Sequence, residues 1–111
     1  MQEPTFLVLT ALLDEPLHGY ALLREIERVS DGRTTMRVGT LYAVLDRLAG
    51  EGLIEISAEE VVSGRLRRTY RITGTGAEAL DAETARLESM ARAARLRFGR
   101  RPGVPGTAGA S

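Results

Sequence analysis

Four arginines lie close together in the middle of the chain, at Arg65, Arg67, Arg68 and Arg71, and residues 64–71 contain no acidic residue. A guanidinium group is permanently charged, and its planar fork of N–H donors matches the oxygens of a phosphate. A run of charge is usually a solvated surface, but the place of this run at the tip of a predicted hairpin favours phosphate contact. For Arg71, an ion pair with a glutamate of the neighbouring strand is an equally good interpretation.

The hairpin that carries these arginines is predicted from alternating apolar residues. Ile54 and Ile56 alternate on its first strand, Tyr70 and Ile72 on its second, and Ser63-Gly64 supplies the turn. Three glutamates of the first strand are placed to pair with the arginines across the hairpin: Glu55, Glu59 and Glu60. Because adjacent strand residues point to opposite faces, Glu59 and Glu60 do not form a catalytic pair of carboxylates.

A helix is predicted directly before the hairpin, over residues 38–48. Its apolar residues recur at spacings of three, four and three, which places them on one face: Val38, Leu41, Leu45 and Leu48. The opposite face is small or polar, which would let the helix approach base edges closely; it holds Gly39, Thr40, Ala43, Asp46 and Arg47. Thr34, Thr35 and Arg37 lead into the helix. Tyr42 either packs at the edge of the core or gives its hydroxyl to a phosphate.

A helix followed by a basic hairpin is the layout of a winged helix, in which the helix enters the major groove of DNA and the hairpin reaches the phosphates beside it. We therefore expect a mainly α fold with a small β-hairpin, and a winged helix-turn-helix over residues 1–75. The alternative is a winged-helix module that binds protein, with the basic hairpin docked on an acidic partner. Val44 is the one apolar residue predicted near the outer face of the helix, which favours DNA.

Two further helices are predicted near the start of the chain. The first begins at Glu3-Pro4, and seven of the eight residues at 6–13 are apolar. A surface helix shows only an apolar stripe, so this helix is predicted to pack against a partner chain as well. The second begins around His18, which is expected to cap it. Four residues are predicted on its inner face: Tyr20, Leu22, Leu23 and Ile26.

A long final helix is predicted over residues 76–98, with a capping box from Thr75 to Glu78. At about 1.5 Å per residue it is roughly 33 Å long. A heptad seam follows one face, through Ala77, Leu80, Thr84, Leu87, Ala91, Ala94 and Phe98. So small a domain cannot cover that seam, which predicts a dimerisation helix. Residues 99–111 carry four glycines and two prolines without periodicity, and we predict a disordered tail.

Composition excludes several classes of function. The chain of 111 residues has no cysteine and a single histidine, so disulfides, thiolate catalysis and a histidine metal site are not expected. It contains no phosphate-cradling glycine loop and no nucleophile–base pair. No apolar run approaches the ~20 residues of a membrane span, and no signal peptide is visible. We expect a cytoplasmic protein without cofactor or metal that is not an enzyme and does not bind membranes.

Four short motifs resemble the PadR family of bacterial transcription regulators, and together they span about residues 5–80. They are His18-Gly19-Tyr20 with Ile26; Gly39-Thr40-Leu41-Tyr42; Leu45, Arg47 and Leu48 followed by Glu51-Gly52-Leu53-Ile54; and Gly64, Arg65, Arg67, Arg68, Tyr70, Ile72 and Thr73 with Gly76. The single long final helix resembles the shorter subtype of the family. The resemblance implies a homodimer that represses nearby genes for efflux, detoxification or stress, and that a small-molecule effector relieves. Some members stack flat drugs between tryptophans, which this chain lacks.

These expectations specify candidate residues and partners. Double-stranded DNA with an inverted-repeat operator is the expected partner, contacted by Thr34, Thr35, Arg37, Gly39, Thr40, Tyr42, Arg47, Arg65, Arg67 and Arg68. The expected homodimer interface contains Phe6, Leu9, Leu80, Leu87, Met90, Ala91, Ala94 and Phe98. An effector, where one exists, is expected at the junction of the first and final helices. The operator sequence, the regulated genes and the choice between repression and activation do not follow from the sequence.

Overall fold

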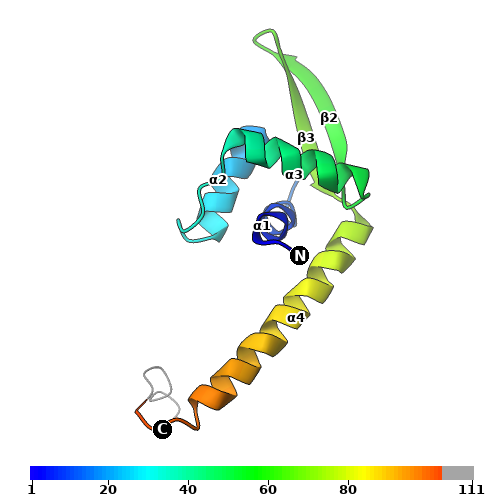
Figure 1. Cartoon of the computed structure of the whole chain (residues 1–111). Coiled ribbons are helices and arrows are strands. Elements are labelled where there is room, and N and C mark those ends of the chain that lie inside the picture. Colours follow the sequence, from blue (N-terminus) through cyan, green and yellow to red (C-terminus); the bar gives the residue numbers. More distant parts are fainter. Residues whose placement is uncertain (104–111) are drawn as a thin grey trace. The chain divides into compact units, whose positions relative to one another are not determined.

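A computed structural model describes residues 1–103 of the chain. Within these residues the elements are α1 (Glu3–Ala11), β1 (Leu17–His18), α2 (Gly19–Val29), α3 (Val38–Gly50), β2 (Ile54–Val62), β3 (Arg65–Ile72) and α4 (Gly74–Phe98) (Figure 1). The chain divides into two compact units, one spanning Met1–Leu80 and the other beginning at Asp81, so the boundary falls within the sequence of α4. The predicted fold class is confirmed, because the described residues form three short helices, a long hairpin and a long last helix.

Helix α1 forms the centre of the first unit, where it lies between α2 and α3 (Figure 1). Five apolar residues of α1 and its C-terminal end are buried: Leu7, Val8, Leu9, Ala11 and Leu12. The chain therefore covers both sides of α1 by itself. The reason given for a partner chain at this helix was therefore wrong, because α2 and α3 supply the cover; contact with a partner stays a prediction. Phe6 remains only partly buried against the core.

Two residues of α3 lie on the other face from the one predicted. Val38 is 49% exposed, whereas Val44 is only 8% exposed. Leu41, Leu45 and Leu48 are fully buried, as predicted. Val44 lies three residues after Leu41 and four before Leu48, so it shares their face of the helix. The apolar face is thus broader and begins one turn later than the predicted row.

Tyr20 on α2 is likewise exposed, at 71%, although it was predicted on the inner face. Leu22 and Ile26 are buried as predicted. Two helical residues that are two positions apart point about 200° away from each other. Tyr20 and Leu22 therefore cannot both face the core, and the larger aromatic side chain lies outside.

The hairpin of β2 and β3 turns at Ser63 and Gly64, as predicted. Both residues have positive φ, 53° and 77°, which is the geometry of a two-residue turn that matches the twist of the strands. The strands pair from Ile54 opposite Ile72 to Val62 opposite Arg65, with an irregularity between Ile56 and Ala58. Strand β1, which was not predicted, pairs Leu17 with Tyr70 and so completes a sheet of order β1-β3-β2 in the described part of the chain.

Helix α4 is capped by Thr73 and not by Thr75. The Thr73 Oγ1 atom accepts a hydrogen bond from the Gly76 N–H at 3.0 Å and donates one to the Gly52 carbonyl at 2.7 Å. This hydroxyl therefore fixes the start of α4 against the loop between α3 and β2. Gly76 is buried in the same place: a Cβ there would overlap the Leu53 carbonyl oxygen and would lie 2.9 Å from Ile72 Cγ1. The close approach of the helix to this loop explains the glycine.

The substitution Gly76→Ala should therefore destabilise the protein by about 1–3 kcal/mol, the usual cost of overpacking. Gly74→Ala is a matched control, because a Cβ at Gly74 meets nothing within 4 Å and the residue also lies in the first turn of α4. Chemical denaturation of the two variants gives the comparison. Equal midpoints for both would show that the loop yields freely to the extra methyl group.

Residues 99–103 follow α4 as turns, closed by N–H groups that donate to carbonyls of the last helical turn, such as Gly99 to Arg95 at 3.0 Å. The rest of the predicted disordered tail, residues 104–111, lies outside the described residues.

Candidate nucleic-acid interface

The Ser30 hydroxyl connects the end of α2 with the loop before α3. Its Oγ accepts a hydrogen bond from the Thr34 N–H at 3.1 Å and donates one to the Glu27 carbonyl at 3.1 Å. Asp31 and Gly32 make the preceding turn with positive φ. These hydrogen bonds connect the first half of the loop, as far as Thr34, to the end of α2.

An exposed polar surface follows at the start of α3. Arg37 occupies the position before the first helical turn, without a side-chain hydrogen bond to that turn. Arg37, Gly39 and Thr40 are exposed, as is Thr35, while Thr34 is partly buried. A hydrogen-bonding hydroxyl, a glycine without side chain and a guanidinium thus lie together on one helix end. Such a surface can approach the edges of base pairs and bond to them.

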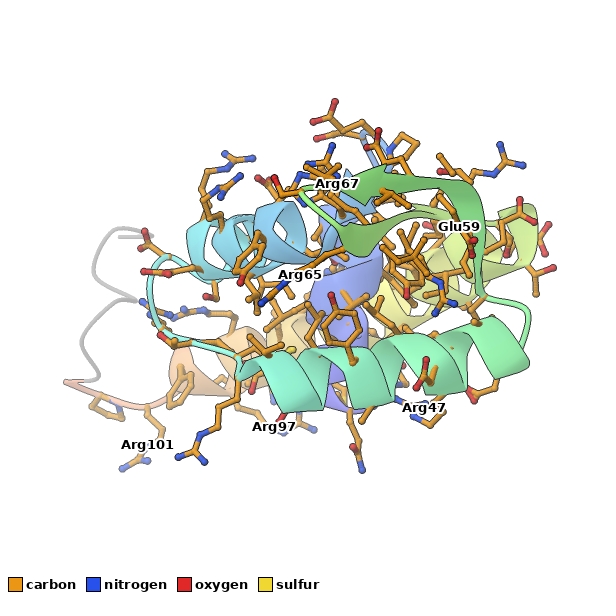
Figure 2. The ribbon with its side chains drawn as sticks, turned by 90° about the horizontal axis from the view of Figure 1, so that it is seen from above. Arg47, Glu59, Arg65, Arg67, Arg97 and Arg101 are labelled. Carbon is orange, nitrogen blue, oxygen red and sulfur yellow. The ribbon has the colours of Figure 1, made fainter. Side chains whose placement is uncertain are left out.

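Arg47, at the other end of α3, is engaged within the fold. Its guanidinium donates a hydrogen bond to the Thr5 hydroxyl of α1 and forms an ion pair with Glu51 at 3.2 Å. Figure 2 labels it on α3. The structure therefore does not bring Arg47 together with the other predicted contact residues. Its hydrogen bonds instead connect α3 to α1.

The arginines of β3 form ion pairs across the hairpin, as predicted from the glutamates. Arg67 lies 2.6 Å from Glu60, Arg68 lies 3.1 Å from Glu59, and Arg71 lies 2.7 Å from Glu55. The hydrogen bond to Glu59 raises the pKa of Arg68. All these side chains are about half exposed, so water and salt screen the pairs. With four arginines and three glutamates the hairpin has a net charge of only +1.

Arg65 differs from the other arginines of the hairpin, because it has no ion pair with any residue in the described part of the chain. Its side chain extends from β3 into the space between α2 and α3 (Figure 2). Tyr42 of α3 lines the same space, and its hydroxyl oxygen would lie only 2.7 Å from a Cβ at Gly19. The sequence alone does not distinguish Arg65 from Arg67 and Arg68. The structure does, because the other two arginines are paired with glutamates.

His18 was predicted to cap α2, but its side chain makes no capping hydrogen bond. It lies in β1, and its Nδ1 atom is buried without a hydrogen-bond partner in the described structure. Tyr70, opposite β1, is buried in the core, and this burial raises the pKa of its hydroxyl. His18 therefore contributes to the small sheet and not to a cap of α2.

The predicted dimer residues fall into two groups. Leu9 and Leu80 are already buried inside the first unit, so their side chains are not accessible to a partner. On the part of α4 beyond Leu80, by contrast, the residues of the heptad seam are exposed: Leu87, Ala91, Ala94 and Phe98, with Met90 beside them. The structure thus leaves the second half of the seam uncovered.

Residues 1–103 contain no cluster of three or more histidine or acidic side chains that is placed to hold a metal ion. No helix among these residues is both long enough and apolar enough to span a bilayer.

Comparison with known proteins gives the family. The profile of the Transcriptional regulator PadR-like family matches residues 8–82, which include α2, α3 and the whole hairpin. The chain belongs to this family. A transcriptional regulator of Mycobacterium tuberculosis, Rv3488, is 40% identical over 79 residues, which are 71% of this chain and 70% of that protein. The family consists of transcriptional regulators, so the prediction that the protein is not an enzyme is confirmed.

Two solved structures share the fold. A PadR family transcription regulator from Clostridium difficile R20291 has a TM-score of 0.73 at 19% identity, over 88% of this chain and all of that one. Bacillus subtilis PadR in complex with operator DNA has a TM-score of 0.67 at 18% identity, over 75% of this chain and 48% of that one. At such identities these likenesses establish the winged-helix fold and no individual contact.

Proposed function

We propose that this PadR-like regulator is a homodimeric repressor that binds an inverted-repeat operator near its own gene. The observation that carries the proposal is the exposed end of α3, where Arg37, Gly39 and Thr40 form a surface suited to base edges next to a basic hairpin. Helix α3 would enter the major groove and the hairpin would contact phosphates beside it. The solved complex of Bacillus subtilis PadR with operator DNA supports this use of the fold.

The division of labour along the chain belongs to the same proposal. Residues 1–75 would bind DNA, residues 76–98 would join two copies, and the protein would act in the cytoplasm. The regulated genes would serve efflux, detoxification or stress, and a small molecule would release the repressor. The exposed seam from Leu87 to Phe98 supports the dimer, because apolar side chains at heptad spacing are normally covered by a second helix.

The rival is a winged helix that binds protein and not DNA. Burial of Val44 removes the apolar residue that was predicted on the outer face of α3, but Val38 and Tyr42 are exposed there. These two residues do not make the outer face of α3 itself broadly apolar; together with residues of α2 and the hairpin they line a hollow beside the helix. The family membership and the polar start of α3 favour DNA.

Fluorescence anisotropy with the chain's own promoter tests the proposal. Thr40→Val keeps the shape of the side chain but removes its hydroxyl, and it should reduce the preference for the promoter over unrelated DNA by about tenfold, since a specific base contact contributes ~1–3 kcal/mol. Ala49→Ser, on the same helix near its other end, is the control. Equal affinity of the wild type for promoter and unrelated DNA would remove the proposed function.

The operator should consist of two inverted half-sites. A two-fold dimer presents two copies of α3 to one face of the DNA, so the half-site centres should lie about 34–36 Å apart, or a multiple of that distance. Hydroxyl-radical footprinting on the promoter should therefore show two protected regions related by symmetry. A single protected half-site at saturation would contradict the dimeric arrangement.

A further inference from the structure

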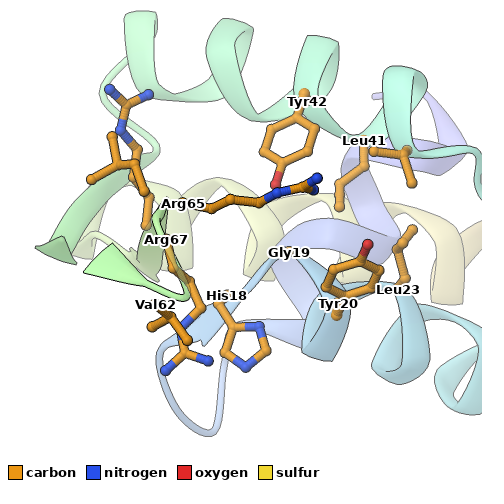
Figure 3. A pocket seen from close by; sticks show the side chains of 12 residues that line it. His18, Gly19, Tyr20, Leu23, Leu41, Tyr42, Val62, Arg65 and Arg67 are labelled. Carbon is orange, nitrogen blue, oxygen red and sulfur yellow. The ribbon is translucent and has the colours of Figure 1, made fainter. Parts of the chain in front are cut away.

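A cavity of about 420 Å³ lies in the first unit, between the start of α2, the exposed side of α3 and the tip of the hairpin (Figure 3). This volume is in the range of sites for small organic molecules. The cavity differs in place from the junction of the first and final helices, where an effector was expected from the sequence. All of its lining residues precede Leu80, so its form depends on the first unit alone.

The walls of the cavity are largely apolar. Aliphatic side chains and tyrosine rings from α2, α3 and the hairpin form them. They are Tyr20, Leu23, Val38, Leu41, Tyr42, Val62 and Leu66. Val38, Val62 and Leu66 are at least 40% exposed, and all three line this one hollow. Exposed aliphatic residues gathered around a hollow mark a surface that gains by being covered.

Among the arginines that line the cavity, Arg65 is the one placed to bind an anion. Figure 3 shows its side chain extending from the hairpin toward Tyr42 and Tyr20. Its neighbours Arg67 and Arg68 also line the cavity, but each is paired with a glutamate, whereas Arg65 has no such pair in the part of the chain described. His18 also lines the cavity, while its Nδ1 atom is buried without a hydrogen-bond partner in the described structure. An apolar hollow with a free guanidinium suits a ligand with an apolar body and one anionic group.

We propose that this cavity binds a small amphipathic anion, held by Arg65 at its charged end and by the aliphatic and tyrosine walls at its apolar end. The cavity separates α3 from the hairpin, the two elements assigned above to the major groove and the phosphates. A ligand there would hold Arg65 in the cavity, where it already lies, and so keep its guanidinium from a phosphate of DNA. Binding of the anion and of DNA are therefore antagonistic, a step that rests on the proposed function, whereas the site itself does not.

Two nearly isosteric probes test the site without DNA. Naphthalene-2-sulfonate carries a permanent negative charge, and naphthalene-2-sulfonamide is neutral. Titration of the full chain should give about tenfold tighter binding for the sulfonate, the effect of one charge-assisted hydrogen bond. Arg65→Gln should reduce the ratio to about one. Arg24→Gln, which neutralises an exposed arginine of α2 outside this cavity, should leave the ratio unchanged.

The position of the probe is followed by amide NMR shifts, which should centre on Gly19, Tyr42 and Leu66. Equal affinity for the two probes, an unchanged ratio in Arg65→Gln, or shifts centred on residues 87–98 would each overturn the site.

With the promoter present, saturating sulfonate should weaken DNA binding of the wild type severalfold and that of Arg65→Gln hardly at all, as linkage between two ligands requires. If the sulfonate occupies the cavity and leaves DNA affinity unchanged, the antagonism is wrong. If no promoter binding occurs at all, the proposed function fails while the probe titrations still decide the site.

Discussion

Replacing Leu87 with aspartate should convert a dimeric protein into monomers. Leu87 lies on the heptad seam of α4 and is 38% exposed in the single chain, so a second helix would complete its burial. The dimer would bury two new carboxylates, one from each protomer, without a compensating positive charge in the seam, and this costs several kcal/mol. The dissociation constant should rise by at least about a hundredfold. Sedimentation equilibrium at micromolar concentration measures it.

Ser89→Asp is the matched control, because it introduces the same charge two residues away. Ser89 is exposed and lies on the opposite side of α4 from the seam residues Leu87 and Ala91. This variant should remain dimeric with wild-type affinity. Leu9 and Leu80 would give no useful variant, since both are buried in the first unit and their replacement would unfold it. A wild type that is a stable monomer at micromolar concentration would remove the dimer altogether.

Local patterns were sufficient to predict most elements from the sequence. The spacing of Leu41, Leu45 and Leu48 identified α3, and Ser63-Gly64 between alternating apolar runs identified the hairpin and its turn. The glutamates of β2 correctly predicted the ion pairs with β3. Each of these features depends on residues close in sequence or directly opposite in one hairpin, where periodicity and charge carry the information.

The features that the sequence did not predict depend on contacts between distant segments. Strand β1 has only two residues, and it forms because Leu17 and His18 pair with the edge of β3 about fifty residues later. Thr75 was predicted as the cap of α4 in place of Thr73, since the loop carbonyl of Gly52 that fixes the Thr73 hydroxyl is remote in sequence. The exposure of Tyr20 is the exception, because it was predictable locally: Leu22 and Ile26 define the inner face of α2, and helical periodicity places Tyr20 on the other side.

In the candidate interface, too, local patterns were predicted and contacts between distant segments were not. The sequence identified the hairpin arginines and the polar residues of α3 as one group, but charge and spacing could not tell which arginines pair with glutamate. The cavity was also missed, because its walls come from α2, α3 and the hairpin and meet only in the folded chain. The one signal in the sequence was the pair of aliphatic residues at the hairpin tip, Val62 and Leu66, which a purely electrostatic hairpin does not require.

Replacing Arg65, Arg67 and Arg68 with alanine should nearly abolish DNA binding at moderate salt. Removal of three phosphate contacts would weaken binding by roughly two to three orders of magnitude, since each charge-assisted contact contributes upward of ~1 kcal/mol. The effect should be similar for promoter and unrelated DNA, because phosphates carry no sequence information. The slope of log affinity against log salt should fall by about 0.9 for each arginine that no longer neutralises a phosphate. Anisotropy titrations from low to moderate salt give both quantities.

A change that makes the hairpin more positive tests its contact with phosphates more sharply. Glu59→Gln with Glu60→Gln removes the carboxylates that hold Arg68 and Arg67 at 3.1 and 2.6 Å, and it raises the net charge of the hairpin from +1 to +3. If these glutamates compete with phosphate, the variant should bind all DNA more tightly and with a steeper salt slope. Arg65→Ala alone should cost more affinity than Arg67→Ala or Arg68→Ala, because Arg65 has no ion pair to break among the described residues. A triple-alanine variant with an unchanged slope would place the hairpin outside the interface, and DNA recognition would then rest on α3 alone.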